Sequence, residues 1–507
     1  MQYMLSILIW LPMIAGVGIC LVGDDARPNR TRALGLLTVI VSLACCVPLM
    51  MGFDPAVQGM QFVEDISWVP ALGIRYHLGI DGLSLILIIL SVFTNLIVFL
   101  ATWESVKTRV SQYIAAFLIM QGLLVGVFAA MDVILFYVFW EATLIPMYLI
   151  IGIWGSDNRV YAAIKFFLYT FLGSVLMLAA FLYLGYHAKS FDLGTLYALK
   201  LSMTAQTLIF IAFFFGFAIK IPMFPVHTWL PDAHTEAPAG GSIMLAAILL
   251  KLGAYGFLRF ALPIVPDACQ YYAPVMIALS LIAVVYVGLI AIVQQDMKRL
   301  IAYSSISHMG FVTLGCFVLF AMVDKSNLQS AGLVLEGAIV IMISHAFVSS
   351  AMFAGVGFIY DRMHSRQIDD FGGIVKSMPV FASFFMLFAM ANAGLPGTSG
   401  FVGEFMVIVG SMKAGFWIAF WAATTLIIGA TYTLWMYKRV IFGPVTNKKV
   451  EALQDLSKFE LSAYSLLAVL VLVMGIYPKP MLDYVHQSVS TTLAQADHSK
   501  LQAKLQG

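Results

Sequence analysis

Residues 217–238 read FAIKIPMFPVHTWLPDAHTEAP, and they interrupt a very apolar part of a chain of 507 residues. The run TLIFIAFFFG precedes them and GGSIMLAAILL follows them. Lys220 lies in this stretch beside Pro222, Pro225 and Pro231, and each proline removes a backbone donor and clashes with the turn before it. We therefore predict that a hydrophobic helix breaks here, next to a buried cation.

The composition is typical of a protein that crosses a membrane many times. Hydrophobic residues make up 61% of the chain and charged residues 11%, with a mean hydropathy of +0.94. A soluble domain has about a quarter charged residues, and polar groups could not cover so apolar a chain in water. The net charge of +2 and the lack of a basic run or an aromatic–basic patch argue against nucleic acid as a partner.

The sequence predicts no cofactor or metal bound by this chain. Its five cysteines lie in or beside apolar segments with no CxxC spacing, which is typical of small buried hydrophobic residues. No P-loop or dinucleotide fingerprint follows a strand–helix pattern. The first apolar stretch has no Lys or Arg before it and no A-x-A site after it, so we interpret it as a retained membrane helix.

Apolar runs of about 20 residues, the length that spans a bilayer, predict about fourteen membrane helices in one compact bundle. Their expected ranges are 4–22, 33–52, 79–101, 112–130, 132–153, 164–187, 205–231, 239–262, 271–293, 299–321, 331–358, 378–410, 414–440 and 462–478. Loops after the odd-numbered spans hold 17 Lys and Arg residues, and the opposite loops hold nine, Lys325 and Lys504 among them. Because basic residues favour the cytoplasmic side, both termini are expected on the periplasmic side.

Four ionisable residues stand out because they lie deep within predicted spans: Glu141, Lys220, Lys251 and Glu404. Such a residue costs at least ~2.5–3.5 kcal/mol on insertion scales and suggests a functional site. Glu141 is about 14 Å and Lys251 about 18 Å along its helix. The alternative is a buried ion pair that only fixes helix packing, but such pairs stabilise poorly because desolvation offsets their attraction.

Histidines inside the bundle are the next candidates. His345 is intramembrane, in IVIMISHAFVSSAMF, and imidazole titrates near neutral pH, which suits a proton relay. The alternative is a hydrogen-bonded core histidine, which is less favoured if Lys251 and Glu404 lie nearby. His227 and His308 lie near breaks or helix ends, where both interpretations stay open.

A second interrupted span reads AMANAGLPGTSGFVGEFMVIVG, with Glu404 just beyond the break. If spans four to eight (112–262) and nine to thirteen (271–440) are two five-helix units, each has its break in the fourth helix, near 220–225 and near 393–400. An odd number of helices makes the second unit inverted, as in many transporters. Residues 1–111 and 441–507 would flank these units.

Freed backbone groups at such breaks are tolerated only inside protein or along a wet cavity, so a hydrated path is expected to cross the membrane there. Burial favours the neutral form of a lysine, whereas a nearby carboxylate favours the charged form. Movement of Glu141 relative to a lysine would therefore switch that lysine between holding and releasing a proton.

Four segments carry a resemblance to a known family: FYVFWEATLIPMYLIIGIWG, KIPMFPVHTWLPDAHTEAPAGGSIMLAAILLKLGAYGFLRF, DMKRLIAYSSISHMGF and GLPGTSGFVGEF. They resemble the antiporter-like subunits of respiratory complex I, the proton-pumping NADH:quinone oxidoreductase, over nearly the whole chain. Most relatives carry a lysine at the position of Glu404, and a glutamate there is typical of one branch of the family.

The resemblance implies a role for each matching residue. Glu141 would modulate Lys220, the proton carrier of the first half-channel, and Lys251 would link the two half-channels. His345 would pass protons onward and Glu404 would deliver them to the outer side. The supporting path would include His227, His308 and Asp132.

The resemblance also implies the setting. Flanking antiporter-like subunits L and N would continue the polar axis in the bacterial inner membrane, and partner subunits would hold FMN, the iron–sulfur clusters and the quinone. Two alternatives stay open: a subunit of a cation/proton antiporter or membrane-bound hydrogenase, and a scaffold that moves no protons. The neighbouring genes would separate the first, and tolerance of charge-neutralising substitutions the second.

Overall fold

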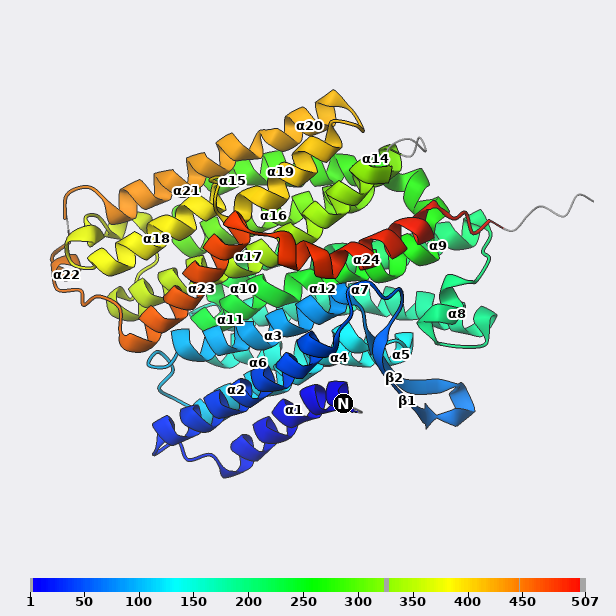
Figure 1. Cartoon of the computed structure of the whole chain (residues 1–507). Coiled ribbons are helices and arrows are strands. Elements are labelled where there is room, and N and C mark those ends of the chain that lie inside the picture. The colour runs from blue at the N-terminus through cyan, green and yellow to red at the C-terminus, as the bar shows by residue number, and fades with distance from the viewer. Residues whose placement is uncertain (1–2, 323–327, 446, 502–507) are drawn as a thin grey trace, which may run out of the picture.

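The computed structural model describes residues 3–322, 328–445 and 447–501, so Lys325 and Lys504 lie outside the described residues. Long helices run side by side in a single bundle (Figure 1). In the first half of the chain they are α1 (Met4–Val22), α2 (Pro28–Gly52), α3 (Gly82–Ala101), α4 (Val110–Ala129), α5 (Val133–Ala142), α6 (Leu144–Trp154), α7 (Arg159–Ala188), α8 (Leu193–Tyr197), α9 (Met203–Lys220), α10 (Trp229–Glu236), α11 (Ala239–Met244), α12 (Leu250–Gly256) and α13 (Leu262–Ile264).

The second half continues the bundle with α14 (Pro266–Ile282), α15 (Gly288–Ile292), α16 (Met297–Val318), α17 (Leu328–Met363), α18 (Pro379–Asn392), α19 (Ser399–Ser411), α20 (Phe416–Ala423), α21 (Thr425–Ile441), α22 (Lys448–Glu451), α23 (Lys458–Ile476) and α24 (Lys479–Asp497). Three π-helical segments join neighbouring helices: η2 (Leu245–Leu249), η3 (Phe257–Ala261) and η4 (Ala283–Val287).

The predicted spans are confirmed in number and approximate position. Among the described residues, 13 helices are long and apolar enough to cross a membrane. The remaining predicted span, 378–410, is divided between the shorter apolar helices α18 and α19. The continuous helix over 239–264 is the central one, because its most apolar window is 100% buried, against 39% for α7 at the edge. Lys251 therefore lies at the centre of the bundle.

Both predicted breaks coincide with ends of helices. The chain leaves α9 after Lys220 and resumes helix at Trp229, and the Trp229 indole N–H donates to the Ile219 carbonyl (2.8 Å) that the break would otherwise leave free. Between α18 and α19, Gly394 has a φ of 76°, in the left-handed region that glycine tolerates best. A Cβ at this position would lie 3.0 Å from Glu404 Oε2, so the turn closes directly over that carboxylate.

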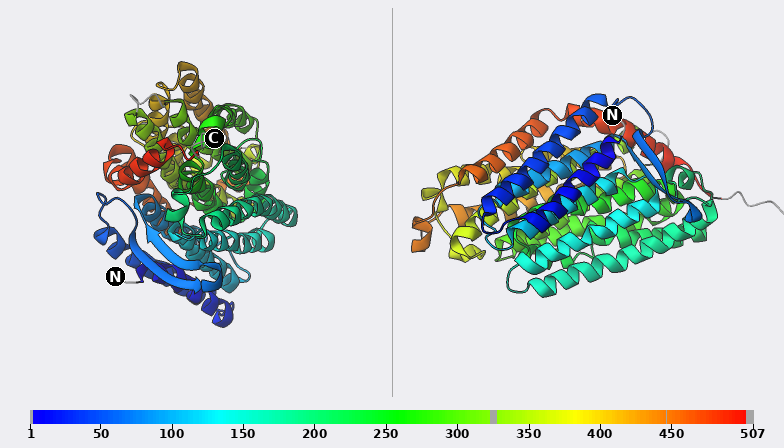
Figure 2. Two further views of the ribbon diagram at one scale, coloured as in Figure 1. Left: turned by 90° about the vertical axis from the view of Figure 1, so that its right-hand side faces the viewer. Right: turned by 90° about the horizontal axis from the view of Figure 1, so that it is seen from below.

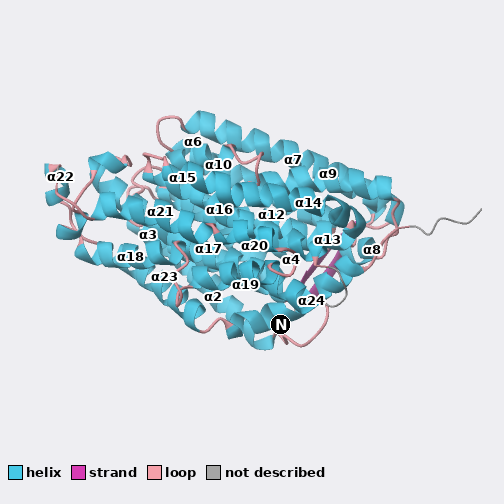
Figure 3. Ribbon diagram, turned by 90° about the horizontal axis from the view of Figure 1, so that it is seen from above, coloured by secondary structure: helices cyan, strands magenta, loops and turns pink. Residues whose placement is uncertain are grey.

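The predicted helical bundle also carries one small β element. Residues 61–80 form a hairpin of β1 (Gln61–Val69) and β2 (Ile74–Ile80), so the third span starts at Gly82 rather than at residue 79 (Figure 3). An isolated two-stranded hairpin is at best marginally stable. Here Glu64 accepts from the Leu5 amide (2.8 Å), and the Arg75 amide donates to Asp132 (3.0 Å). These bonds fix the hairpin across one end of the bundle.

The last helix, α24, follows the fourteenth span and was not predicted as a separate element. It runs back over the bundle against α17, α3 and α13 (Figure 1). The Ser488 hydroxyl on α24 accepts from the Leu83 amide (3.3 Å), and Leu501 pairs with Leu201 in an isolated bridge. Both ends of the described chain consequently lie toward the end of the bundle that carries the hairpin (Figure 2).

Candidate functional site

Glu141 and Lys220 lie close together in the first half of the bundle. Glu141 is on the last turn of α5, just before the helix is interrupted at Thr143, and Lys220 is the last residue of α9. Lys220 is 1% exposed, and its Nζ lies 5.3 Å from the Trp140 ring and 5.8 Å from the Phe166 ring. Within the described residues, neither Glu141 Oε1 nor Lys220 Nζ has a hydrogen-bond partner. The two groups are therefore near neighbours that no hydrogen bond ties together.

Lys251 is hydrogen-bonded to His345 at the centre of the bundle. The Lys251 Nζ lies 2.7 Å from His345 Nδ1 and donates to the Ala246 carbonyl at 2.6 Å. Ala246 belongs to the π-helical segment η2, and π-bulges are frequent at functional sites. Lys251 is 0% and His345 6% exposed, so this polar pair is enclosed by protein.

A second polar pair, His308 and Glu404, lies next to the Lys251–His345 pair. His308 Nδ1 on α16 lies 2.9 Å from Glu404 Oε1 on α19, and the His308 and His345 rings have their centroids 5.9 Å apart. A cavity of about 20 Å³ lies between the pairs, lined by both histidines, Glu404 and Asn392 among others. That volume is enough for one water molecule. We define the row as Lys251, His345, His308 and Glu404.

The structure thus brings together four of the residues predicted from the sequence. His308, for which two interpretations were open, lies in the row. His227 lies in the non-helical stretch after Lys220, is 6% exposed, and stacks on Phe224 with ring centroids 5.6 Å apart. No contact in the described residues joins His227 to the row.

Asp132 is not close to these residues. It is the N-cap of α5, where its carboxylate accepts from the amides of Ile134 (2.9 Å) and Leu135 (3.1 Å) as well as Arg75. It lies nine residues before Glu141, about 14 Å along the helix. Its contacts are those of a helix cap and an anchor for the hairpin.

His234 is a buried residue that the sequence interpretation missed. It lies on α10, is 0% exposed, and stacks on Phe353 with ring centroids 4.3 Å apart. Neither of its ring nitrogens has a hydrogen-bond partner in the part of the chain that the structure describes. No helical spacing could have indicated it, because His227 lies in the non-helical stretch before α10 begins at Trp229.

The chain is similar to known membrane subunits over most of its length. Residues 130–429 match the family model described as NADH:quinone oxidoreductase/Mrp antiporter, transmembrane. NADH-quinone oxidoreductase subunit M of Rhodobacter capsulatus is 45% identical over 99% of this chain and 98% of its own length. NADH-ubiquinone oxidoreductase chain 4 of Marchantia polymorpha is 43% identical over 96% of each chain.

Solved structures of related membrane subunits have the same fold. A chain of respiratory complex I from Thermus thermophilus with bound NADH superposes with a TM-score of 0.87 at 29% identity, covering 97% of this chain and 100% of that one. A chain of the Mrp complex from Dietzia sp. DQ12-45-1b shares the fold, with a TM-score of 0.84 at 19% identity over 98% and 99% of the two chains. The protein belongs to the NADH:quinone oxidoreductase/Mrp antiporter membrane-subunit family, and within it to the antiporter-like subunit M of complex I.

Proposed function

We propose that this subunit translocates protons across the membrane through Glu141, Lys220, Lys251, His345 and Glu404, with His308 between the last two. The observation that carries the proposal is the row of two polar pairs buried at the centre of the bundle: Lys251 is hydrogen-bonded to His345 at 2.7 Å, and His308 forms an ion-pair contact with Glu404 at 2.9 Å. Burial of these ionisable groups has a desolvation cost that apolar side chains would not have, which favours a functional role over a packing role.

The first half of the path works as a switch. Burial of Lys220 favours its neutral form, and a nearby Glu141 carboxylate favours the charged ammonium. Within the described residues, Glu141 Oε1 and Lys220 Nζ make no hydrogen bond, so a small movement of α5 relative to α9 can change the attraction between the two groups. The proton released by Lys220 then passes to Lys251 and along the row.

The second half of the path delivers the proton. Protonation of His345 by Lys251 places a charge beside the water-sized cavity and His308. His308 in turn contacts the Glu404 carboxylate, which accepts the proton. Glu404 lies under the turn at Gly394, and opening of that turn would let the proton leave.

The subunit works within a larger translocase. NADH oxidation and quinone reduction take place in partner subunits that hold the FMN, the iron–sulfur clusters and the quinone, and subunits L and N flank this one. The chain lies in a bacterial inner membrane with both termini in the periplasm. Residues 112–262 and 271–440 form the two inverted repeats, which the corresponding breaks after Lys220 and after Asn392 support.

The test is Glu141→Gln in the assembled complex, with NADH:quinone turnover and proton uptake recorded together in inverted membrane vesicles. The expected result is loss of both with normal assembly, because the neutral amide cannot hold Lys220 in its charged form. Glu451→Gln, at an exposed carboxylate on α22, is the matched control and should behave as wild type. Wild-type turnover and pumping in Glu141→Gln would contradict the proposal.

A further inference from the structure

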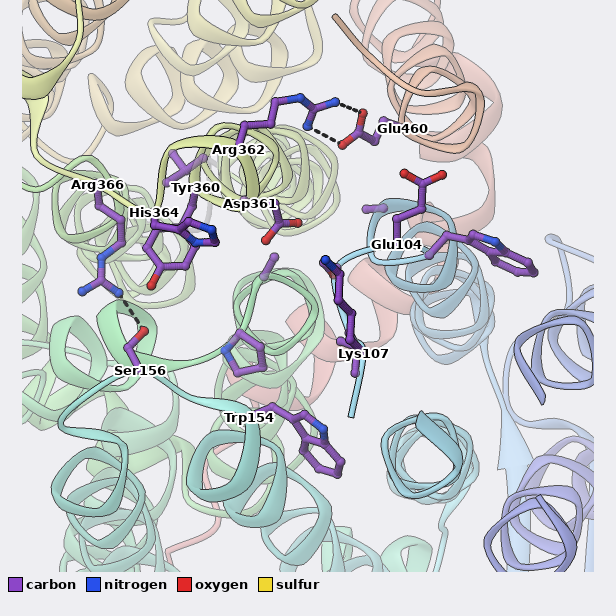
Figure 4. Close-up of a pocket in the computed structure, with 18 of the residues that line it drawn as sticks. Glu104, Lys107, Trp154, Ser156, Tyr360, Asp361, Arg362, His364, Arg366 and Glu460 are labelled. Atoms are coloured by element: carbon purple, nitrogen blue, oxygen red, sulfur yellow. Dashed lines mark hydrogen bonds and ion pairs between the residues drawn. The ribbon is translucent and has the colours of Figure 1, made fainter. Parts of the chain in front are cut away.

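A large open cavity, whose lining is shown in Figure 4, includes none of the residues of the row. It lies at the end of the bundle where α22 is found, opposite the hairpin (Figure 1). Its volume is about 1000 Å³, and it lies between the ends of α3, α6 and α17 and the starts of α16 and α23. At about 30 Å³ per molecule in the liquid, it holds a few tens of waters. By comparison, the cavity beside Arg259 has a volume of about 230 Å³ and the one in the row about 20 Å³.

The charges that line the cavity are of both signs, and part of them are tied to one another. Arg362 donates to both oxygens of Glu460, each at 2.8 Å. Asp361 on α17 and Lys107 in the loop after α3 point toward one another in the cavity (Figure 4), and within the described residues no ion pair joins them. A wall with free groups of both signs does not select an anion or a cation, but it suits water and mobile protons.

Lys298 connects the lining of the cavity to the buried part of the bundle. Lys298, on the first turn of α16, lines the cavity, is 6% exposed, and donates from Nζ to the carbonyl of Ala237. Ala237 follows α10 directly and is three residues beyond His234, about 4.5 Å of helical rise. Lys298 therefore connects the cavity with the buried helix that carries His234.

His234 lies between this lysine and the row. The ring stacks on Phe353 of α17, two helical turns from His345 on the same helix. Its two nitrogens, which no described protein group satisfies, could take a proton on one side and give one up on the other.

We propose that this cavity is the proton entrance to the row, with Asp361 and Lys298 as the groups that carry protons from cavity water to His234. The Asp361 carboxylate takes a proton from water and becomes a carboxylic acid, and Lys298 takes that proton as a neutral amine and becomes an ammonium. His234 then takes it and becomes an imidazolium, which restores the lysine amine. The proposal rests on the proposed function and adds a route into its centre, separate from Glu141 and Lys220.

The experiment uses Asp361→Asn and Lys298→Gln in the assembled complex, with Asp361→Glu as the conservative control. Turnover and proton uptake in inverted vesicles are measured from pH 6 to pH 9. Because protons are scarce at high pH, both neutral variants should lose activity there, roughly tenfold or more at pH 9 relative to pH 6, while Asp361→Glu keeps the wild-type profile. A wild-type pH profile in Asp361→Asn and Lys298→Gln would overturn the proposal.

Glu404→Gln in the same vesicles separates this inference from the proposed function. If Glu404→Gln abolishes pumping while Asp361→Asn and Lys298→Gln keep the wild-type profile, the entrance lies elsewhere and the proposed function stands. If Glu404→Gln pumps as the wild type does, the proposed function itself fails.

A second measurement covers the case in which these variants do not assemble. Lys107→Cys changes only an exposed residue at the mouth of the cavity, in a Cys20→Ser background because Cys20 is exposed. Attachment of a sulfonate thiol reagent should raise the pH at which activity is half lost, and a trimethylammonium reagent should return it toward wild type. Equal pH profiles after both modifications would overturn the proposal.

Discussion

The contribution of the Lys251–His345 hydrogen bond to stability can be separated from its role in proton transfer by a double-mutant cycle. His345→Leu removes the partner of a lysine that is 0% exposed and leaves it only the Ala246 carbonyl as acceptor. A hydrogen bond to a charged group contributes about 1.5–3 kcal/mol, and removal of one partner of a buried pair costs up to about 3–5 kcal/mol. We therefore expect a cost of about 2–3 kcal/mol for His345→Leu.

The second variant of the cycle is Lys251→Met, which replaces the lysine by an apolar side chain of similar length. It leaves His345 with only the Ser349 hydroxyl at 3.4 Å and should cost about 1–3 kcal/mol. In the double variant no polar group is stranded, and apolar replacement of a buried pair is often neutral or stabilising. The coupling free energy of the cycle should therefore be about 1.5–3 kcal/mol.

The assay is the half-life of the assembled complex at an inactivating temperature, together with proton uptake in vesicles. A cost of 2 kcal/mol that falls on the unfolding barrier shortens the half-life by about 30-fold. The double variant should recover most of the half-life and still fail to pump, because Leu and Met cannot carry a proton. Additive losses of stability would refute the hydrogen bond, and a double variant that pumps would refute the role of the row.

Three further predictions concern other parts of the fold. In Gly253→Ala, the added Cβ would lie 2.5 Å from the Phe217 carbonyl oxygen, so α12 must move away from α9 by roughly 1 Å at a cost of about 1–3 kcal/mol, read as a shorter half-life of the complex. Glu404→Gln should keep assembly and lose proton uptake in vesicles. The hydrogen bond from His77 lowers the pKa of Asp192. The stability that this bond contributes is therefore present above pH 4 and is lost as the pH falls through the lowered pKa. His77→Ala should raise the pKa of Asp192, so that proteases cut the hairpin at a higher pH than in the wild type.

Apolar spans could be predicted closely because a membrane helix must satisfy its backbone internally and expose apolar side chains. The first span is Met4–Val22, as expected, and the expected 239–262 is observed as Ala239–Ile264. The breaks could be predicted for a related reason, since Pro222 and Pro225 cannot continue α9 whatever the tertiary structure.

The hairpin and α24 could not be found by the same means. Strands of seven to nine residues carry no 20-residue apolar signal, and the hairpin is held by partners distant in the chain, such as Asp132 and Asp192. Helix α24 has a polar face with Gln487, Ser488 and Thr491, so no window of it is typical of a span. Its position depends on tertiary contacts, which single-sequence patterns do not contain.

The site residues also fall into those that the sequence alone could indicate and those that it could not. A buried charge in an apolar run is visible in the sequence, and Glu141, Lys220, Lys251 and Glu404 could each be identified as out of place. Their partners could not, because Lys251 and His345 are 94 residues apart and meet only through the packing of α17 on the central helix. His234 escaped because PDAHTEAP is polar enough to be taken for a loop, and only its burial marks it.

The buried charged groups have different contacts in the two halves of the bundle, and this difference fits the proposed direction of proton transfer. Glu404 lies in ion-pair contact with His308 at 2.9 Å, so a proton that arrives at His308 finds an acceptor already in place. Lys220 and Glu141 have no such bonds at their buried atoms, and a buried polar group without a partner is costly and tends to move or to attract water. Conformational change in a partner subunit would therefore shift the Glu141–Lys220 end more easily than the His308–Glu404 end. We expect energy to enter the path at the first of these ends, while the second keeps its geometry and receives the proton.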